Sequence, residues 1–400
     1  MNVVNTFTGW VSDNAPSSVQ RALAVRHALR CLPLVHVAGD ETASLKAMRA
    51  AFTANVCLQP WKGMNDIDFP AVTSGFTELI APANNAKFAI IGALKSVTTV
   101  EKQKNSKLTE LTIKDGMDAL RDSVQVSYEH SKKPHSHKRQ ATETDELQEK
   151  LIRQMQIEYD ELAKYDLNFL RTQPLWRQAH FNSQNLNHCF QVGAAQLTSW
   201  GNQETSPWSF WKDWYQRTLD GEPLAWELQQ RIAQIDETIW KAGVEPTAKE
   251  IKRTLHLYQL EQEITKLKRT LTTQTGDTTT YNLGDNGGPP LDDEAERAIQ
   301  TDLALIWMHV DELEAEAAKP EPSRDTLEKL AKWFQDLLAK ATAYFGSKAD
   351  IVLTKSAEVT GTVGTTATIA YLTASSAAQN EGLKGLVEAI WNFAKTLPPG

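Results

Sequence analysis

The sequence predicts a mostly α-helical protein made of several short helical units. Apolar residues recur three and four positions apart along many segments, which is the period of an amphipathic helix. Two such seams, joined by a short turn, predict an antiparallel helical hairpin at about 292–346. Seven of the twelve tryptophans lie between residues 174 and 245, which indicates a compact aromatic-rich unit. A chain of 400 residues favours two or three domains.

Residues 1–130 are expected to form an N-terminal helical domain with irregular connections. The first helical pattern covers residues 17–36, and Pro33 predicts where that helix ends. Weaker helical patterns follow at 42–57 and 86–100. The second of these contains the run FAIIGAL, which also fits a short strand.

The middle of the chain is expected to be a Trp-rich helical domain at 145–272. Residues 131–144 before it are polar, basic and interrupted by Pro134, which is typical of a linker. A helix is predicted from about 145 to 166, and another from Pro246 to about 271. The last helix carries a coiled-coil-like seam made of Leu257, Leu260, Ile264, Leu267 and Leu271.

The C-terminal part is expected at 292–400, after a Thr/Gly/Pro-rich connector at 273–291. Acidic residues from Asp292 onward favour a helix start there, and Ser323 fits the cap of the next helix. The first seam of the hairpin consists of Ile299, Leu303, Ile306, Val310, Leu313 and Ala317. The second consists of Leu327, Leu330, Phe334, Leu337, Ala341 and Tyr344.

Composition narrows the class of protein. The net charge of −8 disfavours a general nucleic-acid binder, which would usually be basic. Cys31, Cys57 and Cys189 match no zinc or redox spacing and are expected to be buried thiols in a reducing compartment. The first ten residues lack the basic and apolar regions of a secretory signal, so a cytoplasmic location is expected.

The sequence predicts no catalytic residue, no cofactor and no metal site. His188 and Cys189 are adjacent, but a Cys-His pair must meet in space, and neighbours on a helix point about 100° apart. His135 and His137 lie among lysines and an arginine, which would repel a metal ion. Both pairs are interpreted as structural or solvated residues.

Trp208, Trp211 and Trp214 form the most distinctive aromatic group and have two interpretations. They could be an exposed platform for a ligand, a sugar or a protein partner. They could equally be a core in which indoles fill the space between short helices, and the leucines that follow favour this core. Gly221 is expected to end the tryptophan helix, with Pro223 preventing its continuation.

The same segment resembles a group of uncharacterised bacterial helical proteins. The shared patterns are W-x-x-W-Y, L-x-G-x-P and W-x-x-G, carried here by Trp211, Trp214, Tyr215, Leu219, Gly221, Pro223, Trp240 and Gly243. The residues ALRCLP at 28–33 fit a further shared pattern. Asn282 to Pro290 fit an N-x-G-x-N-x-P-P element loosely, because one extra glycine precedes Pro289. The resemblance implies a helical plan and supplies no catalytic residue.

The segment from Val359 to Asn380 carries no charge and is rich in Thr, Ala, Ser and Gly. Gly361, Gly364 and Ala367 would let helices approach closely in lipid. The alternative is a buried helix or small-residue loop within a protein core. The amphipathic helix that follows, which includes Trp391, could pack on the core or lie at a lipid surface.

Three functional hypotheses remain open at this stage. The first is a non-enzymatic helical assembly or effector protein with a conditionally membrane-active C-terminal segment; bacterial defence fits it by analogy. It implies self-association or a protein partner and membrane association on activation. The second is a soluble interaction module, such as a sensor or adaptor, without a membrane role. The third is an enzyme whose site is assembled from distant residues.

Overall fold

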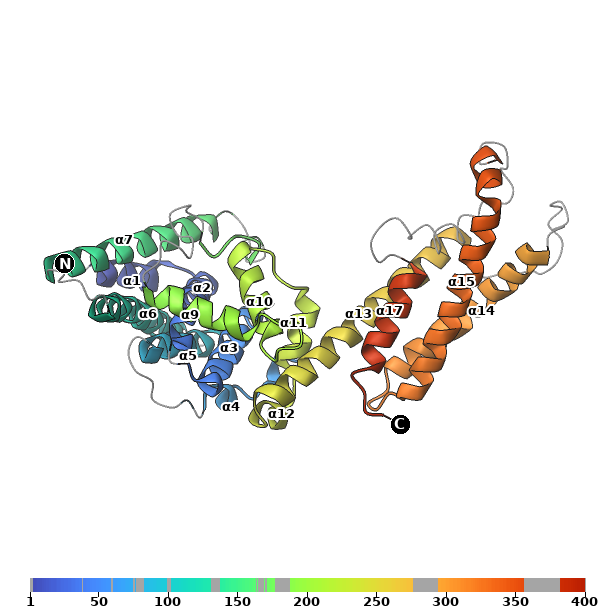
Figure 1. The fold of residues 1–400 in the computed structure, drawn as a ribbon. Helices are drawn as coiled ribbons and strands as arrows, with labels where there is room; N and C mark the ends of the chain where they lie inside the picture. Colours follow the sequence, from blue (N-terminus) through green and yellow to red (C-terminus); the bar gives the residue numbers. More distant parts are fainter. Residues whose placement is uncertain are drawn as a thin grey trace. The chain divides into compact units, whose positions relative to one another are not determined.

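The protein is described by a computed structural model, in which the described residues form helices joined by turns and loops (Figure 1). The described residues are 3–37, 39–58, 60–74, 76, 83–98, 102–130, 137–162, 164, 169, 171–176, 188–275, 294–355 and 382–399. These ranges contain fifteen α-helices and no strand, which confirms the mostly α fold. The chain forms two compact units, unit 1 (Met1–Ile251) and unit 2 (Lys252–Gly400), and each is considered by itself.

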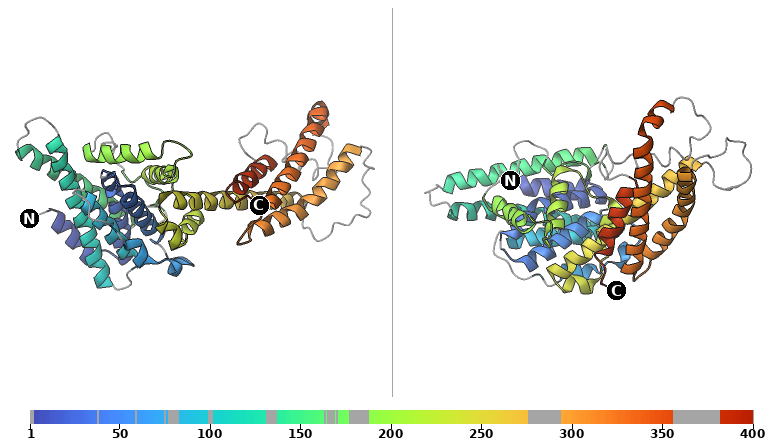
Figure 2. Two further views of the ribbon diagram at one scale, coloured as in Figure 1. Left: turned by 60° about the horizontal axis from the view of Figure 1, so that its bottom comes forward. Right: turned by 45° about the vertical axis from the view of Figure 1, so that its right-hand side comes forward.

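Unit 1 is built around the central helix α2, which packs against α3, α5, α6, α7 and α9 (Figure 2). Almost every residue of α2 from Val19 onward is buried. The helices of this unit are α1 (Val3–Asn14), α2 (Ser17–His36), α3 (Glu41–Val56), α4 (Phe69–Thr73), α5 (Ala83–Thr98), α6 (Lys102–His130), α7 (His137–Leu162), α9 (His188–Trp200), α10 (Ser209–Asp220), α11 (Trp226–Ala233) and α12 (Glu237–Lys241), together with the 3-10 turn Met64–Asp66.

The expected end of the first long helix at Pro33 is wrong, because α2 continues to His36. Proline has no N–H, so the carbonyl of Leu29, four residues earlier, loses its helical partner. The hydroxyl of Tyr215 donates to that carbonyl at 3.1 Å. A side chain from α10 thus satisfies the group that the proline leaves open, and the helix can continue.

Two further local expectations are settled by the structure. The ambiguous run at 88–94 is helical, because it lies within α5 and buries Ala89, Ile90, Ala93 and Leu94 against the core. Residues 137–144, expected in the linker, are the first turns of α7, whereas 131–136 lie outside the described residues. Once Pro134 is passed, the Ala- and Glu-containing sequence is compatible with helix from His137 onward.

The boundary between the two units falls at Ile251, within α13 (Val244–Thr275). The sequence suggested boundaries at 130 and 272, with the tryptophan-rich part as a domain of its own. The structure instead places α10, α11 and α12 in unit 1 together with α2 and α3. Their contacts join residues far apart in sequence, such as Tyr215 and Leu29, which no local pattern indicates.

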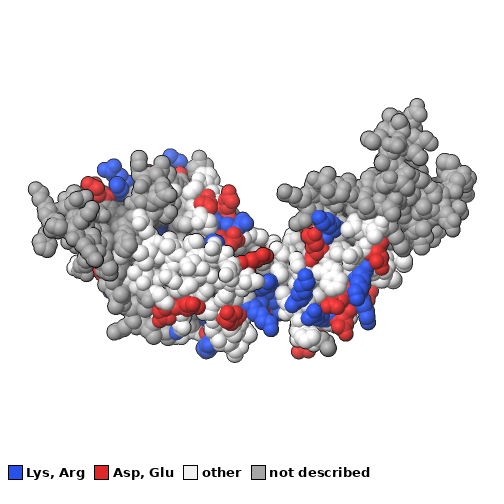
Figure 3. Space-filling model, in the orientation of Figure 1, with Lys and Arg blue, Asp and Glu red and all other residues white. Residues whose placement is uncertain are grey.

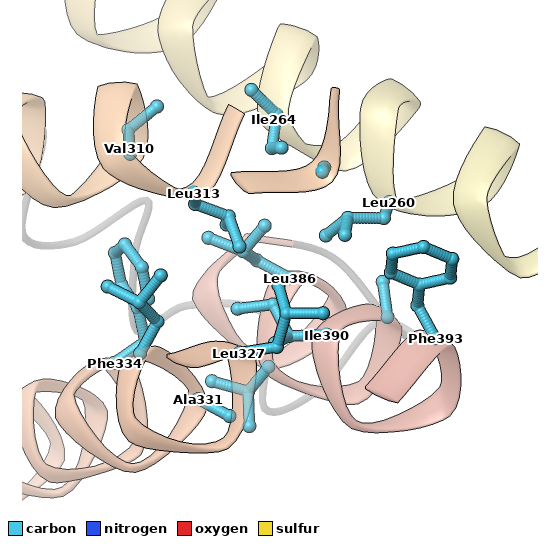
Figure 4. Packing of buried hydrophobic residues seen from close by; sticks show 14 of the residues in the cluster. Leu260, Ile264, Val310, Leu313, Leu327, Ala331, Phe334, Leu386, Ile390 and Phe393 are labelled. Carbon is cyan, nitrogen blue, oxygen red and sulfur yellow. The ribbon is translucent and has the colours of Figure 1, made fainter. Parts of the chain in front are cut away.

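Unit 2 is a helical bundle with a single apolar core (Figure 4). It contains most of α13, then α14 (Glu294–Ala317), α15 (Arg324–Lys355) and α17 (Leu383–Ala394). The predicted hairpin is confirmed, because Ile306, Val310 and Leu313 of α14 share this core with α15 residues. Ile299, Leu303, Ala341 and Tyr344 lie on these helices, but their side chains are outside the described set. The α15 residues in the core are Leu327, Leu330, Phe334 and Leu337.

A polar turn joins the two helices of the hairpin. The carboxylate of Glu316 accepts from the backbone N–H of Ser323 and from the Lys319 ammonium, both at 2.6 Å. The hydroxyl of Ser323 accepts from the N–H of Thr326 at 3.3 Å, which confirms Ser323 as the cap of α15. These contacts fix where α14 ends and α15 begins.

The surface of unit 2 carries both signs of charge. On the face drawn in Figure 3, acidic and basic side chains of this unit lie next to one another. Lys268 of α13, for example, contacts Asp311 at 2.7 Å and Glu314 at 2.5 Å, both on α14. Such exposed pairs each contribute on the order of 1 kcal/mol or less, so the apolar core dominates the stability of the bundle.

Candidate functional site

The tryptophans singled out by the sequence lie inside unit 1. Trp208, Trp211 and Trp214 are 2%, 1% and 1% exposed. Phe52 of α3 meets Trp211 and Trp214 edge-on, with ring centroids 5.8 and 5.2 Å apart. Trp240 of α12 lies 6.1 Å from Trp211. These buried positions fit the second interpretation, an aromatic core that joins α3, α10 and α12, and not an exposed platform.

Gly221, which belongs to the L-x-G-x-P pattern, has a structural role in this protein. Gly221 ends α10 with a φ of +76°, a conformation that residues with a side chain rarely adopt. A Cβ at this position would also lie 2.6 Å from backbone atoms of Gln173 and Pro174. The glycine therefore allows the segment at 172–175 to pass directly over the end of α10, where Leu175 N–H donates to Leu219 O at 2.9 Å.

The amphipathic helix near the C-terminus is α17, and its apolar face is already covered. Leu383, Leu386, Ile390 and Phe393 are fully buried in the unit 2 core, and Trp391 is partly buried against it. The ring nitrogen Nδ1 of His256 on α13 also lies 2.9 Å from the carbonyl of Asn392. The other residues proposed for a membrane or protein contact, Gly361, Gly364 and Ala367, lie outside the described residues.

A buried ion cluster that the sequence analysis missed lies between α2 and α7. Arg26 and Arg30 both bind one oxygen of Glu158: the Arg26 Nε lies 2.8 Å from Oε1, and the Arg30 Nη2 contacts the same atom. Glu158 is 0% exposed, Arg30 1% and Arg26 5%. Arg26 and Arg30 lie four residues apart, on one face of a helix rich in Ala, Leu and Val, and this spacing was the available sequence signal.

Backbone carbonyls also take part in the cluster. Arg26 donates to Pro174 O at 2.8 Å, and Arg30 donates to Leu175 O at 2.9 Å from Nη2 and 3.1 Å from Nε. Burial alone would raise the pKa of Glu158, but the neighbouring Arg26 and Arg30 guanidinium groups outweigh it and leave that pKa below its usual value. Glu158 is therefore ionised in the folded protein at neutral pH.

A small pocket opens beside this cluster and contains a third arginine, Arg171. Its guanidinium stacks on the ring of Trp226 at 3.7 Å, and its Nη2 donates to the carbonyl of Asn55 at 3.2 Å. The Nε of Arg171 is buried and has no hydrogen-bond partner. Burial lowers the pKa of Arg171 to about 10. The pocket is lined by Arg26, Leu29, Asn55, Leu58, Arg171, Thr218 and Pro223.

The three cysteines are free and buried thiols, and burial raises the pKa of Cys31 and Cys57 to about 12. A thiol with such a pKa is almost entirely protonated at neutral pH and is a poor nucleophile. Cys189 lies on α9, and the side chain of its neighbour His188 is outside the described residues. His135 and the side chain of His137 are also outside them.

Among the residues that the structure describes, no three His, Cys, Asp or Glu side chains gather as a metal site would require. None of the helices within the described ranges is both long and apolar enough to cross a bilayer. Comparisons with known protein families, with curated proteins and with solved structures found no match to this chain.

Proposed function

We propose that this protein is a non-enzymatic helical effector that acts through self-association and a conditional membrane contact of the uncharged segment Val359–Asn380. The observation that carries the proposal is that the helices on both sides of this segment, α15 and α17, pack on each other in one bundle. Both ends of an uncharged stretch of 22 residues are thereby attached to the same soluble core.

This attachment explains why membrane contact would be conditional. A 22-residue helix is about 33 Å long at roughly 1.5 Å per residue, which matches the hydrocarbon core of a bilayer. A single span would place Lys355 and Leu383 on opposite sides of the membrane. Because α17 begins at Leu383, it would have to leave the bundle before the segment could cross.

The release of α17 has a large free-energy cost. Leu383, Leu386, Ile390 and Phe393 are each 0% exposed, and exposing a large apolar side chain costs roughly 1.5–3 kcal/mol. Four such side chains give about 6–12 kcal/mol. A lone threonine-rich helix gains little in lipid, so several copies packing through Gly361, Gly364 and Ala367 would have to provide the compensation.

The test is leakage of dye from anionic liposomes. Ile390→Ala weakens the α17 contact and should increase the leakage rate of the full chain, whereas Asn392→Ala, on the exposed face of α17, should not. Gly364→Leu and a chain truncated after Lys348 should both abolish leakage. Absence of leakage from the parent and from Ile390→Ala, under conditions where the protein is active in cells, would reject the membrane role.

A soluble interaction module is the second candidate, and exposed apolar residues on α14 favour it. Met308 is 55% exposed and Leu305 37% exposed, although the same helix buries Ile306 and Val310 completely. Exposed large apolar side chains of this kind are common in protein contact surfaces. If Met308→Ser removes biological activity while the liposome variants leave it unchanged, this candidate replaces the membrane proposal.

A further inference from the structure

Two lysines and a histidine lie around the point where α13 meets the C-terminal end of α17 in unit 2. The ring nitrogen Nδ1 of His256 on α13 lies 2.9 Å from the carbonyl of Asn392 on α17, and this contact joins the two helices. Lys252 precedes His256 by four residues, and Lys395 follows Asn392 by three. Residues at these spacings are neighbours on one helix face, so each lysine lies one turn from the contact.

The direction of the two helices brings the lysines to the same side of this contact. In Figure 4, Leu260 of α13 lies beside Phe393 of α17, and Ile264 lies nearer Leu386, so the helices run antiparallel. In an antiparallel pair, residues that precede Leu260 on α13 lie beside residues that follow Phe393 on α17. Both lysines meet this condition and therefore lie at one end of the bundle.

The charges at this end of the bundle are of one sign. Lys252 and Lys395 are exposed, and His256 is partly buried. Burial lowers the pKa of His256, the carbonyl that its ring contacts opposes this, and the two lysine ammonium groups lower the pKa further. Glu388 of α17 lies seven residues before Lys395 and pairs with Lys384 at 3.9 Å. A negative charge bound at this end would relieve the repulsion between the lysines.

A tryptophan beside the lysines indicates the kind of anion. Trp391 lies one helical turn before Lys395, whose backbone N–H donates to the Trp391 carbonyl at 3.1 Å. The indole packs on the unit 2 core and is only partly buried. Tryptophan rings are enriched at the level of lipid headgroups, and a lysine side chain can cover apolar surface while its ammonium reaches the polar layer. This combination favours a membrane surface over a soluble phosphate compound.

We propose that the end of unit 2 formed by Lys252, Trp391 and Lys395 docks on membranes that contain anionic phospholipids. The two ammonium groups contact headgroup phosphates, and the exposed part of the indole enters the headgroup layer. The inference rests on the proposed membrane contact and adds to it the docking surface and the charge of the lipid. Docking requires no release of α17, because both lysines are exposed while α17 is packed in the bundle.

The experiment measures co-sedimentation of the full chain with liposomes of phosphatidylcholine, alone or mixed with phosphatidylglycerol, at physiological ionic strength. We expect binding to the mixed liposomes and much weaker binding to the neutral ones. Lys252→Gln and Lys395→Gln should each weaken binding about fivefold, the effect of one lysine near an anionic surface. Both side chains are exposed, so both variants should fold like the parent.

Lys384→Gln is the matched control for Lys395→Gln. It removes the same charge near the other end of α17, where Lys384 is 53% exposed and pairs with Glu388. Eleven residues of helix separate the two lysines by about 16 Å, roughly two Debye lengths at physiological salt. Binding by Lys384→Gln should therefore stay close to that of the parent. Lys252→Arg retains the positive charge and should also bind like the parent.

Three results would overturn the docking surface. They are equal binding of the parent to neutral and anionic liposomes, equal weakening by Lys384→Gln and Lys395→Gln, and competition by inorganic phosphate at the concentration of the lipid phosphate. Gly364→Leu separates this inference from the membrane proposal, because it should dock like the parent without causing leakage. Docking without leakage in the parent and in Ile390→Ala would reject only the insertion of Val359–Asn380. Leakage that does not depend on either lysine would reject only the docking surface.

Discussion

At the scale of single residues, the least predictable feature is the cluster of Arg26, Arg30 and Glu158. The two arginines could be noticed in the sequence, because a spacing of four residues places them on one face of a helix rich in Ala, Leu and Val. Their partner could not, since Glu158 lies 132 and 128 residues away. Only the folded contact between α2 and α7 shows that one carboxylate serves two guanidinium groups.

Replacing Glu158 by Gln should destabilise unit 1 by roughly 3–5 kcal/mol, because two buried arginines would lose the carboxylate that they share. Urea unfolding followed by circular dichroism measures this difference. Glu149→Gln on the same helix is the control: Glu149 is 57% exposed and pairs only loosely with Arg153, so its effect should stay within about 0.5 kcal/mol. Equal effects of the two variants would contradict the assignment of a buried cluster.

Two buried histidines predict how stability depends on pH. Burial, with Arg30 adding to it at His27, lowers the pKa of His27 and of His36 from 6.5 to about 3. Between pH 6.5 and 3 the unfolded chain therefore binds two protons that the folded chain does not, and stability falls with decreasing pH. The loss is about 1.4 kcal/mol per pH unit for each fully titrating histidine.

His36→Gln isolates one of these contributions. Its unfolding free energy should depend less steeply on pH than that of the parent, by about 1.4 kcal/mol per unit between pH 5.5 and 4. Comparison with the parent cancels other groups, including Asp115, whose pKa burial raises to about 6 and which acts in the opposite direction. Parallel pH profiles for the two proteins would show that His36 does not contribute.

At the scale of elements, helices with a regular apolar seam were predictable, whereas only some of their ends were. The α14–α15 hairpin follows from spacing alone, and Ser323 could be assigned as a cap from its position after the Pro-rich turn. Pro33 misled the prediction, because the rule that proline ends a helix assumes that nothing else satisfies the open carbonyl. Tyr215, distant in sequence, does so.

The hairpin seam can be tested with two neighbouring substitutions. Ile306→Asp places a carboxylate at a position that is 0% exposed, and unit 2 should lose about 3 kcal/mol or more. Met308→Asp adds the same charge two residues later at 55% exposure and should change stability by no more than about 0.5 kcal/mol. Chemical denaturation of both variants measures the contrast, and similar midpoints would mean that the seam is assigned to the wrong face.

At the scale of the whole molecule, the division into two units could not be read from the sequence. Tryptophan content suggested a separate domain at 145–272, but Trp211 and Trp214 find their partner in Phe52 of α3. The seam of α13 was visible as Leu260, Ile264 and Leu267, yet its partners in α14, α15 and α17 were not. Domain limits depend on such long-range pairs, which local periodicity does not encode.

Two separate cores should give two separable unfolding transitions. Glu158→Gln should lower the midpoint of one transition and Ile306→Asp the midpoint of the other, because each substitution affects only the core that contains it. Differential scanning calorimetry of the parent and both variants measures this. If both substitutions lower one common transition to the same extent, the two units unfold as a single cooperative structure.

The buried cysteines can report how often unit 1 opens locally. Cys31, Cys57 and Cys189 are all buried, and all three belong to unit 1. A thiol reagent can react only when the helices around a cysteine separate, so the modification rate counts openings of α2, α3 and α9 in the otherwise native protein. Unit 2 contains no cysteine. Mass spectrometry of the labelled chain would therefore measure the rate of local opening in unit 1 alone, without any introduced probe.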